Sequence, residues 1–412
     1  MVKKSLNIFM TIIVLLIFIN SASAVNYLTF TAEMDSCSFA IKMKDYLTNN
    51  PTVQYSLNDG NTWEPMVNDI FVNLRKKGDK ALLRGYNFQG ISNSMFGDMS
   101  FVMKGRIAAG GSVMSLIDGK GDCDEIPNGY CFSGLFSNCE SLTCPPQLTA
   151  TKLTKGCYSW MFYKCTNLVQ APELPAMKLA EDCYGQMFDG CSSLISAPEL
   201  PATELKEKCY RGMFSNCISM THAPKLPAMV MAKKCYCSMF AGCTNLKHAS
   251  HLPSVTLAEA CYEWMFSDCV NLVEAPELPS VKLSRECYSG MFAGCVNLTH
   301  GPQLPATSLE VQCYRWMFVK CINMQEAPVL PAKDLDIGCY YGMFLGCLNL
   351  SYVKVEFEDW GEFIEGWNLW NTDKWLKGVA KSGIFVCSKK LKRKKGVNWI
   401  PRGWLIRENE NE

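Results

Sequence analysis

Residues 183–205 read CYGQMFDGCSSLISAPELPATEL, and this arrangement of cysteine, aromatic, leucine and proline residues returns along most of the 412-residue chain. Its leading cysteine recurs at positions 131, 157, 183, 209, 235, 261, 287, 313 and 339, and a second cysteine follows each of them eight residues later. The period is therefore 26 residues, without an insertion. A fixed period of this length indicates stacked units, none of which can bury its apolar face alone.

Each unit predicts one short helix and one short strand. Leu179, Cys183 and Met187 fall at helical spacing, and Gly190 stands where such a helix would end. Residues 194–200 contain a proline, which fits only a short edge-like strand or an extended turn because proline has no N–H to donate. The expected fold class is an α/β repeat solenoid that is leucine-rich-repeat-like, with a short strand plus a short helix per turn.

The repeat also resembles a known family. The stretch FAGCTNL at residues 240–246 carries an aromatic, a small residue, a cysteine and a leucine, and in this it resembles the bacterial surface leucine-rich repeats called BspA-like. The resemblance covers nine repeats, residues 123–352, although the family's usual unit is shorter and has fewer prolines. It implies an adhesin that binds host proteins or other cells, and it carries over no catalytic residue.

The two ends of the chain lack the period. Residues 25–115 contain β-rich runs separated by turn signals and predict a small β-sandwich-like domain. Within them, SLNDGNTW at residues 56–63 resembles the Asp box of sialidase-type propellers, with Asn58 at the usual aspartate position, which implies a hairpin and no glycosidase. Residues 353–412 are rich in tryptophan and are expected to cap the last repeat. A tryptophan-rich sugar platform is the alternative for this segment.

Residues 1–24 have the pattern of a signal peptide. Lys3 and Lys4 precede an apolar run, and Ala22-Ser23-Ala24 fits the small-residue rule for cleavage. A retained membrane anchor is the alternative, but the run is short for the roughly 20 residues that span a bilayer. We therefore expect an exported protein, secreted or held at a bacterial cell surface, with no transmembrane helix after cleavage.

The charge balance argues against a nucleic-acid partner. Without the leader the chain has 38 basic and 39 acidic residues, so it has no excess of positive charge to capture a polyanion. The exception is the run at residues 389–395, where six of seven residues are Lys or Arg. The simpler interpretation of this run is a solvated turn in the terminal cap.

Eighteen of the 23 cysteines belong to the two periodic columns. Their side chains would project in parallel from neighbouring turns, a poor geometry for a disulfide, so we expect buried thiols. No Cys-x-x-Cys motif indicates zinc, and buried thiols do not suit nucleophilic catalysis. We expect no enzyme activity, no catalytic residue, no metal and no cofactor. The better disulfide candidates are the non-periodic cysteines, with Cys123 and Cys144 the first pair to test: Cys37, Cys123, Cys144, Cys237 and Cys387.

The variable residues between the fixed columns are the candidate binding surface, with a protein on host or neighbouring cells as the expected partner and a glycan as a further possibility. On the predicted strand side these residues are Gln170, Glu173, Ser196, Glu199, His222, Lys225, His248, His251, Glu274, Glu277, His300, Gln303 and Glu326. The histidines and glutamates at one repeat position suggest either a pH-responsive or metal-binding stripe or ordinary polar decoration, and we favour the second.

Two further possibilities stay open at this point. Trp160, Trp264 and Trp316 share one repeat position and predict either a second, aromatic patch or simple packing between turns. The alternative function is a carbohydrate-binding or glycan-processing envelope protein that uses the N-terminal β domain and the tryptophan-rich end. An enzyme of that kind needs paired acids in a cleft, and no such pair is evident.

Overall fold

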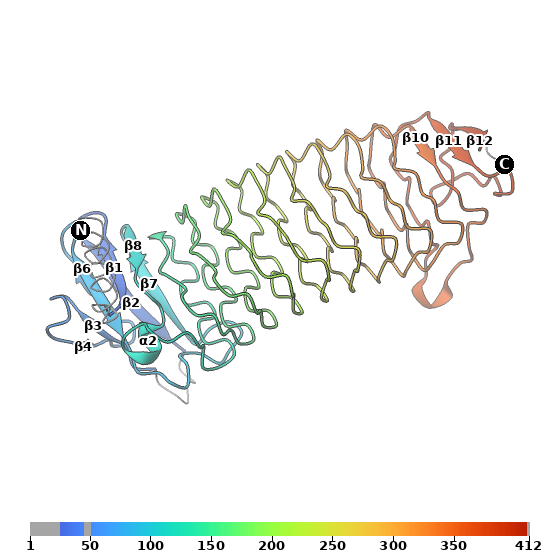
Figure 1. Ribbon diagram of the computed structural model, residues 1–412. Helices are drawn as coiled ribbons and strands as arrows, with labels where there is room; N and C mark the ends of the chain where they lie inside the picture. Colours follow the sequence, from blue (N-terminus) through green and yellow to red (C-terminus); the bar gives the residue numbers. More distant parts are fainter. Residues whose placement is uncertain (1–24, 45–50, 410–412) are drawn as a thin grey trace, which may run out of the picture.

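The computed structural model describes residues 25–44 and 51–409, so the predicted signal peptide at residues 1–24 lies outside the described residues. The molecule is elongated (Figure 1). Two small sheets form its N-terminal end, a long row of stacked turns follows, and a third small sheet lies at its C-terminal end. In the described part of the chain, no helix is long and apolar enough to cross a membrane.

The N-terminal end consists of two sheets that pack on one another. Phe30 of β1 contacts Phe39 of β2 and Phe101 of β7, each at a ring-centroid distance of 5.0 Å. The larger sheet has the order β4 (Glu64–Pro65), β3 (Gln54–Ser56), β6 (Lys80–Arg84), β1 (Leu28–Ala32), β8 (Ile107–Gly110) and β9 (Leu142–Cys144). The smaller sheet has the order β5 (Val72–Leu74), β2 (Cys37–Met43) and β7 (Met99–Lys104). A short α-helical turn, α2 (Ser115–Asp118), follows β8.

The Asp-box-like stretch forms the hairpin between β3 and β4. Asn58 Oδ1 accepts a hydrogen bond from the Ser56 hydroxyl at 2.8 Å and one from the Thr62 amide at 3.0 Å, which closes the turn. Gly60 adopts a φ of +86°, a left-handed conformation that glycine reaches without a steric penalty. These hydrogen bonds show that the side chains of this stretch hold the turn of the hairpin.

The predicted helix in each repeat is wrong. The only helices in the described residues are α2 and the 3-10 turn η1 (Glu365–Trp367), and neither lies in a repeat. The cysteine-rich half of each repeat instead makes successive tight turns, with a left-handed residue at every fourth position. In one repeat these residues are Asp182, Gln186 and Gly190, with φ of +52°, +53° and +77°.

The hydrogen bonds show why these turns are no helix. The amide of Phe162 donates to the carbonyl of Met187 in the next repeat at 2.9 Å, whereas the amide of Met161 donates within its own turn to Tyr158 at 3.3 Å. This alternation continues along the segment, so half of the N–H groups join one turn to the next. An α-helix would use every N–H internally. The apolar spacing that suggested 3.6 residues per turn is in fact a period of four.

The predicted strand in each repeat is also wrong as an extended element. Only isolated parallel bridges form on this side, such as Gln170 to Ser196 and His222 to His248. Prolines explain the interruption, because Pro198 and Pro201 and their equivalents remove N–H groups that a continuous ladder would need. The repeats are therefore stacked turns of irregular backbone, and the helix-and-strand architecture does not apply to them.

Identical side chains stack on one another along the interior. The phenylalanine rings of successive repeats lie nearly parallel at centroid distances from 5.5 to 6.0 Å, and the tyrosine rings do the same at similar spacing. Each cysteine of the second column donates its S–H to a phenylalanine carbonyl, as Cys191 Sγ does to Phe162 at 3.0 Å. Aromatic rings, methionines and thiols thus fill a continuous core that runs from the N-terminal sheets to the C-terminal end.

All eighteen periodic cysteines are buried and free, as the sequence predicted. Burial raises the pKa of the Cys157 and Cys191 thiols to about 12, because the interior cannot solvate a thiolate. The proposed pairing of Cys123 with Cys144 does not form, and Cys37 and Cys237 are free as well. Cys144 is exposed and Cys123 is half-buried, which makes these two the accessible thiols.

We expect the native protein to react rapidly with a thiol reagent at no more than about two sites at pH 8. The buried thiols are protonated and shielded, so only Cys144 and Cys123 should modify quickly, and the eighteen periodic thiols should appear once a denaturant is added. Mass spectrometry after brief alkylation measures this. Cys144→Ser should remove one of the two fast sites and leave Cys123 as the other. Extensive labelling of the folded protein would contradict a core of buried thiols. So would the labelling of far fewer than eighteen thiols in the denatured protein without a reductant.

The C-terminal end covers the last repeat. A parallel sheet in the order β10 (Tyr352–Lys354), β11 (Ile384–Cys387) and β12 (Leu405–Glu408) continues the stack. Trp360, Trp375 and Trp404 are buried, and each indole N–H donates to a backbone carbonyl, at 2.7 Å, 3.1 Å and 2.8 Å respectively. These three rings are core residues of the end module, so they are not available as a sugar platform.

Candidate interaction surface

Two columns of polar residues run along one side of the stacked turns. The first polar column consists of Gln170, Ser196, His222, His248, Glu274, His300 and Glu326. The second polar column lies three residues further along each turn and consists of Glu173, Glu199, Lys225, His251, Glu277 and Gln303. All thirteen are exposed. The structure thus brings every site residue expected from the sequence to the surface.

The backbone holds the first polar column in register. Parallel bridges join His222 to His248 and His248 to Glu274, and the two imidazole rings stack at 5.4 Å. The same register extends beyond the column at both ends: Cys144 of β9 precedes it by one repeat, and Glu326 bridges to Tyr352 of β10. The column therefore runs between the two terminal sheets, and its side chains are spaced by the distance between turns.

The second polar column stands on an extended segment whose side chains alternate. Glu173, Pro175 and Met177 are exposed, whereas Leu174 and Ala176 between them are buried. Alternation of this kind is typical of extended backbone with one face on a core. Each turn therefore presents every second side chain of this segment to solvent.

Sequence reasoning missed a third, apolar column that follows from this alternation. Four residues after the second polar column, Met177, Met229, Val255 and Val281 occupy one repeat position and are between 50 % and 58 % exposed. We call these four residues the apolar stripe. The 26-residue period contains the signal, because the same position is apolar in four of the repeats. An exposed apolar row beside polar residues is typical of a surface that another molecule covers.

The polar columns carry an excess of carboxylates. They contain five glutamates and one lysine, and no member of either column takes part in an ion pair among residues 25–44 and 51–409. The His222 and His300 rings lie 3.0 Å from the hydroxyls of the preceding threonines, which fixes their orientation. The unpaired glutamates leave this side of the molecule open to a basic or hydrogen-bonding partner.

The sequence left open whether the histidine and glutamate column binds a metal ion. Within the residues that the structure describes, no three His, Cys, Asp or Glu side chains are placed so that they could hold a metal ion. Neighbouring members of a column project in parallel, one per turn, whereas a metal site needs ligands that converge. The column is better described as a polar surface.

Packing explains two of the three tryptophans of the turn side, Trp264 and Trp316. Trp264 lies over Gly290 of the next repeat, where an added Cβ would come within 2.4 Å of the ring, and Trp316 lies over Gly342 in the same way. The Arg315 guanidinium covers the Trp316 ring at 3.7 Å. A ring that spans two turns needs a glycine beneath it, so these residues have a structural role that the repeat spacing alone did not show.

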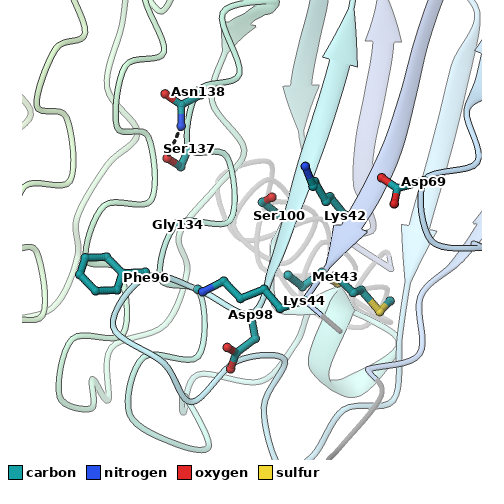
Figure 2. A pocket seen from close by; sticks show the side chains of 12 residues that line it. Lys42, Met43, Lys44, Asp69, Phe96, Asp98, Ser100, Gly134, Ser137 and Asn138 are labelled. Carbon is teal, nitrogen blue, oxygen red and sulfur yellow. Dashed lines mark hydrogen bonds between the residues drawn. The ribbon is translucent and has the colours of Figure 1, made fainter. Parts of the chain in front are cut away.

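A hollow of about 550 Å³ at the junction of the N-terminal sheets and the first repeat is the other candidate site (Figure 2). Lys42 of β2 and Ser100 of β7 line it from the smaller sheet. Asp69 lines it from the loop between β4 and β5, and Asn138 from the first repeat. In Figure 2 the carboxylate of Asp98 points away from Lys42 and Ser100. Asp98 Oδ2 accepts hydrogen bonds from the Ser92 hydroxyl at 3.3 Å and from the Asn93 amide at 3.0 Å, so the loop before β7 holds this carboxylate.

Comparisons of this chain with protein-family models, with characterised proteins and with solved structures give no match. The likeness to BspA-like repeats therefore depends on the residue pattern alone.

Proposed function

We propose that this protein is a non-enzymatic binding protein that recognises a protein partner through the two polar columns and the apolar stripe. The observation that carries the proposal is the apolar stripe, a row of methionines and valines exposed beside polar side chains. Protein interfaces combine an apolar centre with a polar rim, and methionine is enriched in them. The polar columns and the stripe supply both parts on one side of the turns.

The rigidity of the scaffold supports the same function. Each turn is fixed to its neighbours by backbone hydrogen bonds and by stacked rings, so the side chains at the surface are held at set intervals before a partner arrives. A preorganised surface loses little conformational entropy on binding. Repeat scaffolds commonly present extended binding surfaces in this way.

The glycan alternative has less support. It depended on a tryptophan-rich platform at the C-terminal end, where Trp360, Trp375 and Trp404 are buried and Trp367 is 43 % exposed. The polar columns have no aromatic residue between His222 and Glu326 other than the imidazoles, and sugars prefer to stack on larger aromatic faces.

The same proposal places the protein outside the cell. The leader pattern at residues 1–24 supports export to the medium or to a bacterial cell surface. A partner on a host or neighbouring cell is then the expected ligand, in line with the resemblance to surface repeats.

We expect a variant with the apolar stripe charged, M177K/M229K/V255K/V281K, to lose its partner. Mature protein on beads is used to capture proteins from matrix and neighbouring-cell extracts, and the bound proteins are quantified by mass spectrometry. A true partner should be reduced at least tenfold on the stripe variant, because a lysine in a desolvated interface costs more than about 1.4 kcal/mol. A second variant, E173A/E199A/E274A/E277A, should weaken capture less and make it less dependent on salt.

The matched control is K178A/K206A/E310A, which changes exposed charges outside the polar columns and the apolar stripe. It should retain the partner at the level of the unmodified protein. If every captured protein binds all variants equally, the surface is not the recognition site. If only sugars on a glycan array are bound, the alternative function is the correct one.

A further inference from the structure

The charges of the chain are divided between its body and its C-terminal end. Residues 25–373 contain 27 basic and 36 acidic residues, whereas residues 374–412 contain 11 basic and only three acidic residues, at positions 408, 410 and 412. The near-neutral total therefore conceals an acidic body and a basic end. In the elongated molecule the basic end lies opposite the N-terminal sheets (Figure 1).

The fold collects several of these basic residues around β12, the edge strand of the C-terminal sheet. Residues 388–404 cross the end of the stack and bury Leu391, Ile400 and Trp404 against the last turns. Lys395 Nζ donates to the Trp404 carbonyl at 3.5 Å, and Arg393 pairs with Glu408, so both side chains lie beside β12. We call the exposed residues here the end-face patch: Lys381, Arg393, Lys395, Val397, Arg402, Leu405 and Arg407.

Apolar side chains are exposed among these charges. Leu405 is 66 % exposed, and it lies two residues from Arg407 on β12, so both side chains point to the same face of the strand. Val397, in the turn between Lys395 and Ile400, is 49 % exposed. A hydrated polymer would leave these apolar groups in water, whereas the interface of a bilayer accepts apolar and basic groups together.

We propose that the end-face patch docks this protein on an anionic phospholipid surface, with the stacked turns projecting away from it. Basic side chains within a Debye length of such a surface are attracted to it, and Leu405 and Val397 supply the apolar contact that a charge patch alone lacks. Two kinds of interaction together give an attachment that neither gives alone.

The charge division also determines the orientation. An acidic body is repelled by the anionic surface that attracts the basic end, so the long axis stands away from the surface rather than lying along it. This orientation leaves the polar columns and the apolar stripe free. The proposal concerns a different part of the molecule from the proposed partner site, and either can fail without the other.

The test is co-sedimentation of the mature protein with vesicles of phosphatidylcholine and phosphatidylglycerol in a ratio of three to one, compared with phosphatidylcholine alone. We expect binding only to the anionic vesicles at 50 mM NaCl and at least a tenfold loss of affinity at 500 mM NaCl, because salt screens the attraction. The variant K395E/R402E/R407E should bind at least tenfold more weakly. Leu405→Ser should weaken binding severalfold and leave its salt dependence unchanged.

The matched control, K178E/K206E/K282E, makes the same change of net charge at exposed lysines of the stacked turns and should bind like the unmodified protein. Thermal unfolding shows whether each variant is folded. If K395E/R402E/R407E does not fold, Leu405→Ser still tests the proposal. The proposal would be overturned if K395E/R402E/R407E and the control variant lost vesicle affinity equally, or if the unmodified protein did not bind anionic vesicles. Binding to heparin or duplex DNA without vesicle binding would assign the patch to a polymer instead.

Discussion

Near pH 10 the protein is expected to unfold, although it is folded at pH 8. The cause is the core of eighteen buried thiols, whose pKa values burial raises, to about 12 for Cys131, Cys157 and Cys209. In the unfolded chain the same thiols have a pKa near the ordinary value of 9.0. Below that pH both states hold their protons, so the thiols do not affect stability. Above it the unfolded state releases protons that the folded state keeps, and stability falls as the pH rises towards the folded pKa.

The size of the effect follows from the number of thiols. One pH unit above its unfolded pKa, each thiol shifts the unfolding free energy by about 1.4 kcal/mol, and eighteen thiols shift it by about 25 kcal/mol. Most proteins have a total stability of about 5–15 kcal/mol, so the transition should be complete near pH 10. The buried tyrosines act in the same direction, because burial raises the pKa of Tyr184 and its equivalents well above 10.0.

Tryptophan fluorescence and near-ultraviolet circular dichroism, recorded from pH 7 to pH 11 with a phosphine reductant, measure this transition. Proton release on unfolding at pH 10 should be on the order of fifteen per molecule. Repetition in 0.5 M NaCl is the control, since salt suppresses general charge repulsion but does not change the protonation of a buried thiol. A protein that is fully stable at pH 10, or whose alkaline transition salt removes, would contradict the mechanism.

Phe240→Ala is expected to lower the free energy of unfolding by about 3–5 kcal/mol. The ring is fully buried and stacks between Phe214 at 5.8 Å and Phe266 at 5.6 Å, so its loss leaves a cavity that two neighbouring turns cannot fill. The backbone of each turn is fixed to the turns beside it, which limits its relaxation. Urea unfolding monitored by fluorescence measures the change.

Phe88→Ala is the matched control, because this phenylalanine is 63 % exposed and its removal should change stability by less than about 0.5 kcal/mol. If Phe240→Ala costs less than about 1 kcal/mol, the stacked aromatic column does not contribute to stability in the way that the structure indicates.

The sequence predicted which residues are buried and which are exposed much better than it predicted the backbone. The fixed positions Cys183, Met187 and Phe188 are fully buried, and all thirteen residues of the two polar columns are exposed. Burial and exposure depend only on the repeat period, because residues at the same repeat position have the same surroundings in every turn. The period is visible without knowledge of the conformation.

The conformation within the repeat was predicted wrongly because two periods look alike over a short segment. Apolar residues at a period of four fit a helix of 3.6 residues per turn for about two turns, and the repeat ends before the two diverge. One repeat carried the correcting signal, since Gly338, Gly342 and Gly346 stand four residues apart inside the supposed helix. Three glycines in so short a segment disfavour a helix and suit left-handed turn positions, where they have φ of +57°, +59° and +76°.

The apolar stripe was missed for a different reason. The predicted surface contained only the variable polar positions, and the alternation of buried and exposed side chains after the first proline of each repeat was not followed to Met177. The sequence contains this alternation, but two prolines per repeat obscure it, because they interrupt the usual pattern of a strand.

The phenylalanine rings of successive turns stack at centroid distances between 5.5 and 6.0 Å, so the length of the rod grows by one fixed step with each turn. Duplication of one 26-residue unit would lengthen the rod by a single such step, and the inserted turn would find the same partners above and below it. The modules at both extremities would stay attached and unaltered. Variants of different length are therefore expected to fold equally well and to differ in how far they extend and how many contacts they offer.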